Sequence, residues 1–186
     1  IHLKKAIPFG AGLGGGSSDA AFMLKLLRQY AQLDLTDDAL ERIAARLGAD
    51  CAFFVRNRPV IATGIGDVFR PTNISLAGYH IAIVKPSVSV STRAAYAAIR
   101  PAKPAVPLSE VIRRPVTEWR HALKNDFESP IFARHPSIGH IKAQLYDAGA
   151  LYAAMSGSGS AVFGLFHREP SLPPFTDCFV WQGQLE

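Results

Sequence analysis

Cysteine is scarce in this chain. Only two of the 186 residues are cysteines, and Cys51 and Cys178 lie too far apart in the sequence to form a C-x-x-C pair. Two cysteines cannot build the disulfide framework on which small secreted domains depend. We therefore expect both side chains to be reduced thiols in the core of a cytoplasmic protein.

Long apolar runs are also lacking. No run reaches the roughly 18 apolar residues that a membrane-spanning helix needs, so we expect no membrane partner. The chain starts at Ile1, without a Met and without the apolar core of a signal peptide. This start predicts that the sequence is a fragment or a trimmed chain.

Basic clusters are missing although the net charge is +5. The only adjacent basic pairs are Lys4-Lys5 and Arg113-Arg114, and no aromatic residues alternate with basic ones. Proteins that bind nucleic acid concentrate such residues on one face. We therefore expect no nucleic-acid partner, and the mild positive charge favours a small anionic molecule.

Apolar spacing and turn residues predict a chain of mixed helices and strands. Pro8 should end a first strand, Thr36 and Ser91 should cap helices, and Gly48 should follow the end of the second helix at its C′ position. Helices and strands do not alternate as regular βαβ units, which indicates the α+β class. The predicted strands are 1–7, two within 59–70, 79–84, 151–155, 161–166 and 178–181; the predicted helices are a buried one at 18–33, one from 37, one at 92–100 and several short ones within 108–148.

The glycine-rich stretch "PFGAGLGGGSSDAA", residues 8–21, stands directly before the first predicted helix. Three interpretations compete: a flexible loop, a dinucleotide-binding fingerprint at Gly10-x-Gly12-x-x-Gly15, or a phosphate-binding loop of a kinase. A lone G-x-G-x-x-G is weak, and the preceding segment with Lys4-Lys5 and Pro8 does not look like a buried Rossmann strand. Glycines followed by a helix N-terminus favour phosphate, although no Walker A lysine is present.

The stretch resembles the P-x-G-x-G-L-G-S-S-A phosphate motif of the GHMP kinases. Four further stretches resemble that family in the same order: "LGADCAFFV", "ATGIGDVFRP", "LKNDFE" and "MSGSGSAVFG", at residues 47–55, 62–71, 123–128 and 155–164. The triple glycine and the "SSDAA" ending most resemble the branch that phosphorylates 4-diphosphocytidyl-2-C-methyl-D-erythritol in non-mevalonate isoprenoid (terpenoid) biosynthesis.

The resemblance implies roles for individual residues. Asp50 would be the catalytic carboxylate, although on its own it could equally cap the following helix. Gly157-Ser158-Gly159-Ser160 would shape the active site, or else form a tight turn between strands. Asp19 is expected in the first helical turn, where the helix dipole favours an acid. The ATP-binding residues would be Pro8, Phe9, Gly10, Ala11, Gly12, Leu13, Gly14, Gly15, Gly16, Ser17 and Ser18.

The resemblance also implies the fold and the reaction. We expect a GHMP kinase fold with a truncated ribosomal-S5-domain-2-like part at 1–76 and a ferredoxin-like part at 77–186. ATP and Mg²⁺ would be the cofactors, and the transferase would be a monomer or a weak homodimer acting on a small molecule. Alternatives are a homoserine- or mevalonate-type kinase and a non-enzymatic RNA-binding domain.

The family's first motif, a K-x-N-L-like segment that carries a catalytic lysine and contacts to the cytidine, has no match in this sequence. Neither that lysine, nor the cytidine contacts, nor the metal ligands are therefore assigned. We expect the 186-residue chain alone to bind ATP weakly and to be a poor kinase.

Overall fold

The computed structural model describes residues 1–186, and the chain forms two compact units. The smaller unit is Gly14–Ile74, and the larger unit combines Ile1–Leu13 with Ser75–Glu186. Residues 1–13 thus belong to the same unit as the C-terminal half. The predicted division into family domains at 76/77 remains a prediction.

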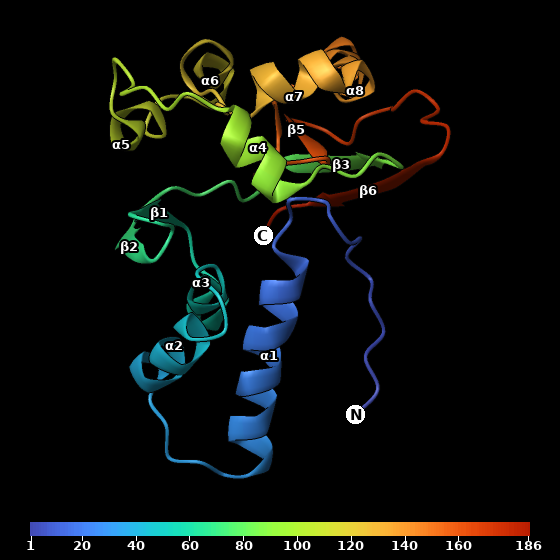
Figure 1. Cartoon of the computed structure of the whole chain (residues 1–186). Helices are drawn as coiled ribbons and strands as arrows, with labels where there is room; N and C mark the ends of the chain where they lie inside the picture. The colour runs from blue at the N-terminus through green and yellow to red at the C-terminus, as the bar shows by residue number, and fades with distance from the viewer. The chain divides into compact units, whose positions relative to one another are not determined.

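The smaller unit consists of three helices and a two-stranded hairpin (Figure 1). Antiparallel pairing of Val60 with Pro71 and of Thr63 with Val68 confirms the predicted hairpin. Its elements are α1 (Gly15–Tyr30), α2 (Asp37–Ala45), α3 (Cys51–Arg56), β1 (Val60–Thr63) and β2 (Val68–Pro71). Its core consists of Ala21, Leu40, Ala44, Cys51, Ala52 and Val55.

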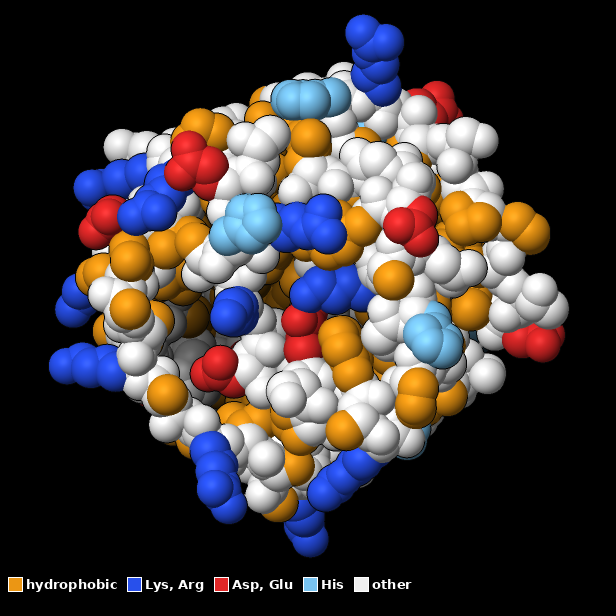
Figure 2. Space-filling model, turned by 90° about the horizontal axis from the view of Figure 1, so that it is seen from above, with side chains coloured by type: hydrophobic (Ala, Val, Ile, Leu, Met, Phe, Trp, Pro, Cys, Tyr) orange, Lys and Arg blue, Asp and Glu red, His pale blue; other side chains and the backbone are white.

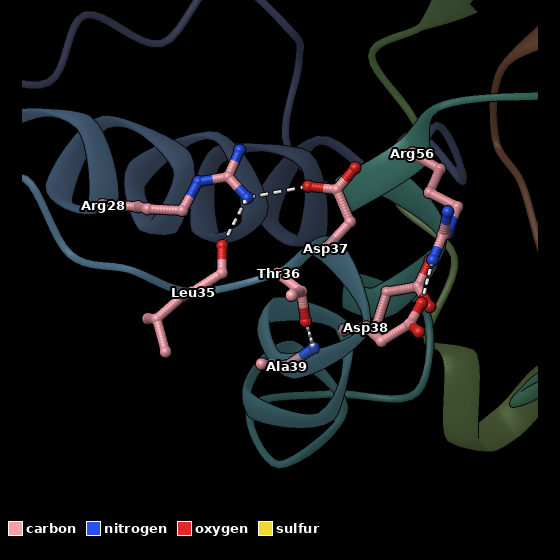
Figure 3. Close-up of polar contacts among 8 residues, drawn as sticks. Arg28, Leu35, Thr36, Asp37, Asp38, Ala39 and Arg56 are labelled. Atoms are coloured by element: carbon pink, nitrogen blue, oxygen red, sulfur yellow. Dashed lines mark hydrogen bonds and ion pairs between the residues drawn. The ribbon is translucent and has the colours of Figure 1, made fainter.

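Polar contacts connect the three helices of this unit (Figure 3). Thr36 Oγ1 accepts a hydrogen bond from the Ala39 amide at 3.2 Å, which confirms the predicted N-cap of α2. The Arg28 guanidinium of α1 donates to Asp37 at 2.7 Å. Arg56, at the end of α3, donates to Asp38 and to Glu41 on α2. Ion pairs of Arg28 and Arg56 therefore join α2 to α1 and to α3.

The larger unit is built on a four-stranded antiparallel sheet of order β4-β5-β3-β6. Helices α6, α7 and α8 lie on one side of this sheet (Figure 1). The strands are β3 (His80–Pro86), β4 (Tyr152–Met155), β5 (Val162–Phe166) and β6 (Cys178–Gln184), and the helices are α4 (Thr92–Ala98), α5 (Leu108–Val111), α6 (Val116–Ala122), α7 (Glu128–Arg134) and α8 (Pro136–Asp147).

The core of the larger unit lies between the sheet and its helices. Its buried residues are Ala82, Val84, Val90, Ala95, Ile131, Ile138, Ile141, Leu145, Ala153, Met155, Val162 and Phe166. Met155 pairs with Val162 across strands β4 and β5. The residues 156–161 that join them are called here the β4–β5 turn. Because both flanking strands are buried, this turn starts and ends on a fixed framework.

Several predicted elements are confirmed and others are wrong. The chain is α+β, and Ser91 caps α4 through a 3.4 Å hydrogen bond from the Ala94 amide. Residues 1–7 form no strand, because no other strand pairs with them. Gly48 lies two residues beyond the Arg46 cap of α2 rather than one. Both cysteines are free thiols, but only Cys51 is fully buried.

Helix α1 differs from its prediction in two ways. It begins at Gly15, three residues before the predicted start, so no acidic residue lies in its first turn and Asp19 falls beyond it. Ala21 is its only buried residue, and Leu27 is 44% exposed. The predicted well-buried helix is therefore wrong. None of the helices in the chain combines the length and the apolarity that crossing a bilayer requires.

Candidate active site

The first half of the glycine-rich stretch lies against the β4–β5 turn in the larger unit. The carbonyl oxygens of Gly10 and Ala11 accept hydrogen bonds from the amides of Ser160 at 3.3 Å and Ala161 at 3.0 Å. The Ser156 hydroxyl donates to the Gly12 carbonyl oxygen at 2.8 Å. Three successive carbonyl groups of the stretch are thus bound by one turn, so the turn fixes the path of the backbone.

Gly12 is the point of closest approach between the two segments. Its φ is +72°, and a Cβ built on it would overlap the Ser156 carbonyl oxygen and lie 3.0 Å from the Gly159 amide nitrogen. No side chain fits there, and an L-residue would also be strained at this φ. Glycine is therefore required at this position by the protein's own backbone.

The second half of the stretch forms the N-terminus of α1 in the smaller unit. Gly14 is the N-cap residue with φ 66°, and the Ser18 amide donates to its carbonyl oxygen at 2.8 Å. The amides of Gly15, Gly16 and Ser17 precede that first intrahelical bond, so they are available to an anion. A Cβ built on Gly16 would meet nothing within 4 Å. The helix end therefore offers three amides outside the intrahelical hydrogen bonds, and the space beside Gly16 is open.

Asp50 begins helix α3, which packs against α1. Asp50 occupies the N-cap position of α3, as the alternative interpretation expects, but its side chain makes no capping hydrogen bond. Phe54 follows one helical turn later, on the same face of α3, and its ring would lie 2.8 Å from a Cβ on Gly14. The face of α3 that carries Asp50 is thus the face turned toward the start of α1.

The Asp50 carboxylate is exposed and lies beside the turn between β1 and β2. A Cβ on Gly66 would be 3.6 Å from Asp50 Oδ1. The "ATGIGDVFRP" stretch was singled out by its likeness to a family motif, and the structure places it next to the predicted catalytic carboxylate. An exposed carboxylate with no capping role can accept a proton from a hydroxyl group.

The predicted site residues fall into two groups, one in each compact unit. Asp50 shares the smaller unit with Gly14–Ser18, and Pro8–Leu13 share the larger unit with Gly157–Ser160. Ala11 is buried, whereas the Phe9 side chain is 75% exposed. In the larger unit the Ser158 and Thr92 hydroxyl oxygens lie 3.4 Å apart. No group of three or more His, Cys, Asp or Glu side chains is placed to hold a metal ion.

The sequence analysis did not single out the residues that hold the β4–β5 turn in place. Asn125 Nδ2 donates to the carbonyl oxygens of Met155 and Gly157, both at 2.8 Å. Glu128 Oε1 accepts from the Met155 amide at 2.8 Å. The "LKNDFE" stretch was noted as a family motif, but its spacing gives no hint that its partners lie about thirty residues further along the chain.

Comparison with known proteins connects this geometry to a family. The family models of the GHMP kinases N terminal domain and the GHMP kinases C terminal region match residues 1–58 and 108–173. The 4-diphosphocytidyl-2-C-methyl-D-erythritol kinases of Parabacteroides distasonis and Bacteroides thetaiotaomicron are each 58% identical to the chain. Both alignments cover 100% of this chain and 69% of the relative.

Solved structures agree with this result. The crystal structure of a 4-(cytidine 5'-diphospho)-2C-methyl-D-erythritol kinase matches with a TM-score of 0.74 and 35% identity, covering 88% of this chain and 60% of that one. Homoserine kinase from Cytophaga hutchinsonii matches with a TM-score of 0.69 but only 15% identity, so it shares the fold alone. The chain therefore belongs to the GHMP kinases, within the group of the 4-diphosphocytidyl-2-C-methyl-D-erythritol kinases.

Proposed function

We propose that the chain takes part in transfer of the γ-phosphate of ATP to the 2-hydroxyl of 4-diphosphocytidyl-2-C-methyl-D-erythritol. The observation that carries this proposal is the 58% identity, over the whole chain, to kinases named for that substrate. The available amides at the start of α1 support the ATP part of the proposal. Because the chain spans about two thirds of these relatives, the activity of the whole protein is part of the proposal.

Phosphoryl transfer to an alcohol requires in-line positioning, neutralisation of charge and an acceptor for the hydroxyl proton. In our proposal Pro8–Ser18 hold the ATP phosphates through backbone amides, and the α1 dipole favours their negative charge. The Ser17 and Ser18 hydroxyls would contact phosphate or Mg²⁺. The Mg²⁺ ion, when bound, supplies the positive charge that a Walker A lysine supplies elsewhere.

Asp50 has the role of proton acceptor in this proposal. Its carboxylate is exposed beside Gly66 and makes no capping hydrogen bond, so it is available to orient the substrate hydroxyl and to take its proton. Gly157–Ser160 shape the site indirectly in this proposal: the Ser160 amide holds the Gly10 carbonyl group, and the adjoining Ala161 and Ser156 hold those of Ala11 and Gly12. The nucleotide and the alcohol substrate are both anionic, which suits the net charge of +5.

The alternatives have less support. The likeness to homoserine kinases is one of fold, at 15% and 17% identity. On the face shown in Figure 2, acidic and apolar side chains stand among the Lys and Arg side chains, and an RNA-binding domain instead clusters its basic residues. We place the reaction in the cytoplasm, in keeping with two free thiols.

The test is ADP release by the protein as its gene encodes it. We expect turnover with 4-diphosphocytidyl-2-C-methyl-D-erythritol and none with homoserine or mevalonate. Asp50→Asn should lower kcat by about 10²–10⁴-fold, the contribution typical of general acid–base catalysis, with little change in KM. It should change the unfolding midpoint only slightly, because the Asp50 side chain makes no capping hydrogen bond and loses only its interaction with the α3 dipole.

The matched control is Asp34→Asn, which removes the same charge from an exposed residue between α1 and α2. It should keep the wild-type rate. An Asp50→Asn variant with wild-type kcat would refute the catalytic role, and preferred turnover of homoserine would refute the substrate. The 186-residue chain is assayed alongside, because the sequence predicts that it is a poor kinase by itself.

A further inference from the structure

We infer that Asn125 is a positioning residue that sets the affinity for ATP from a distance, by holding the β4–β5 turn against the phosphate-binding backbone of Gly10–Gly12. The inference rests on the proposed function, because it takes that backbone to contact the nucleotide. Asn125 lies just before α7 and is far from Gly12 in sequence. Every contact in the argument lies within the larger unit.

The Asn125 side chain makes three hydrogen bonds, which use both of its N–H donors and its oxygen. Both N–H groups of its amide are donated, to the carbonyl oxygens of Met155 and Gly157 at 2.8 Å each. Its Oδ1 accepts from the Phe127 amide at 2.9 Å. An amide has two donors and one oxygen, so each group has a partner and only one orientation of the amide satisfies all three bonds. Asn125 therefore clamps the residue before the turn and the second residue within it.

Glu128 binds the amide of Met155, the residue whose carbonyl group Asn125 binds. Its Oε1 accepts from the Met155 amide at 2.8 Å, and its Oε2 accepts from Lys142 Nζ at 2.6 Å. Glu128 is 9% exposed, and the charge-assisted bonds compensate for its burial. The amide and the carbonyl group of Met155 are both held by side chains from the α7 region. The start of the turn thus has little freedom to move.

The turn passes this constraint to the phosphate-binding backbone. Ser156 Oγ donates to the Gly12 carbonyl oxygen at 2.8 Å, and the Ser160 and Ala161 amides donate to Gly10 and Ala11. Gly12 has no room for a Cβ against Ser156, so the two backbones are in close contact here. A displacement of the turn therefore displaces Gly10–Gly12 as well. The amides that would meet phosphate move with them.

Asn125→Asp is the sharpest test, because it is nearly isosteric. A carboxylate keeps the acceptor for the Phe127 amide, but it presents an oxygen to two carbonyl oxygens and so removes two donors at once. We expect the KM for ATP to rise about tenfold or more, as expected for the loss of such bonds. The KM for the alcohol substrate should stay within about twofold of wild type, the ordinary scatter of a residue that is not involved.

Ser129→Asp is the matched control. Ser129 is an exposed residue in the first turn of α7, so the variant adds the same charge without approaching the turn. It should keep the wild-type KM for ATP. Hydrogen exchange gives a readout independent of catalysis: the amides of Ser160 and Ala161 should exchange at least about tenfold faster in Asn125→Asp and at the wild-type rate in Ser129→Asp.

A second variant keeps the test decisive if Asn125→Asp fails to fold. Ser156→Ala removes only the hydroxyl that binds Gly12, and it should also raise the KM for ATP. The double variant Asn125→Ser/Ser156→Ala should raise the KM for ATP by less than the product of the two single-variant factors, because both residues act through one turn. The inference would be overturned if the two single-variant factors in the KM for ATP simply multiplied in the double variant. A wild-type KM for ATP in an active, folded Asn125→Asp variant would overturn it as well. Absence of ADP release from the wild-type protein with every alcohol would instead refute the proposed function, and hydrogen exchange would still test the positioning role.

Discussion

Gly12 shows that a single glycine in the glycine-rich stretch can serve the protein's own packing. Its missing side chain makes room for the Ser156 carbonyl oxygen and the Gly159 amide. Gly16 is different, because the space beside it is open. The sequence predicts that side chains must be absent from this stretch, but it cannot tell a glycine that faces a ligand from one that faces backbone. Both positions require a residue without a Cβ, and glycine is the only one.

Substituting these two glycines separates the two cases. Gly12→Ala should lower the free energy of unfolding by about 2–5 kcal/mol, the combined cost of a left-handed L-residue and of overpacking against backbone. Gly16→Ala should raise it by up to about 1 kcal/mol, since alanine is favoured over glycine within a helix. Urea denaturation of the two variants and the wild type measures both effects. A Gly12→Ala variant with the wild-type midpoint would show that Gly12 is not packed as described.

Asp50 illustrates how a candidate catalytic residue can be predicted from the sequence. The residue was found by its likeness to a family motif, since an aspartate before an apolar segment is most simply explained as a helix cap. The structure places Asp50 at the N-cap position, but the carboxylate makes no capping hydrogen bond, so capping does not occupy it. Asn125 also lies in a stretch that resembles a family motif, but its role could not be predicted, because its partners depend on how β4 meets α7 in three dimensions.

At the scale of elements, caps and turns were predicted better than burial. Thr36 and Ser91 cap α2 and α4, as local side-chain chemistry predicts. Helix α1 was expected to be buried along its apolar face, yet Leu27 on that face is 44% exposed. Periodicity identifies the apolar face of a helix. It does not say whether another element packs on that face.

The connection between α1 and α2 gives a prediction about pH. The hydrogen bond from Arg28 holds the pKa of the Asp37 carboxyl below its usual range. A carboxylate whose pKa is lower in the folded state stabilises that state above its ordinary pKa of about 3.9, and this stabilisation is lost as the pH falls through the lower value. Asp37→Asn should therefore lower the urea midpoint at pH 7, by a small amount because the pair is exposed.

The difference between Asp37→Asn and wild type should shrink progressively below about pH 4, where the wild-type carboxylate also becomes neutral. Asp34→Asn is the control, because it removes the same charge from the same connection but leaves the Arg28 contact in place. Urea titrations between pH 7 and pH 3 follow all three proteins. A difference that stays constant down to pH 3 would mean that Arg28 does not act through the ionised form of Asp37.

At the scale of the whole molecule, the order of motifs predicted the family and the fold class but not the composition of the compact units. Residues 1–13 cluster with the C-terminal half because Gly10, Ala11 and Gly12 are bound by the β4–β5 turn, about 145 residues further along the chain. Hydrogen bonds between such distant segments leave no local pattern in a sequence. The glycine-rich stretch is consequently divided between the units at Leu13 and Gly14.

Binding of Mg²⁺-ATP should stabilise the whole molecule, because a ligand that binds only the folded state adds to the free energy of unfolding. At a concentration of 100 times Kd the gain is about 2.7 kcal/mol, which for a chain of this length raises Tm by roughly 5–10 °C. Asp50→Asn should show the same rise, since in our proposal Asp50 acts on the hydroxyl and not on the nucleotide. Adenosine, which lacks the phosphates that the start of α1 would bind, should leave Tm unchanged. Scanning calorimetry of both proteins with each ligand measures these shifts in Tm. Equal Tm shifts with ATP and adenosine would argue against phosphate binding at Gly14–Ser18. Loss of the ATP-induced Tm shift in Asp50→Asn would reassign Asp50 from proton transfer to nucleotide binding.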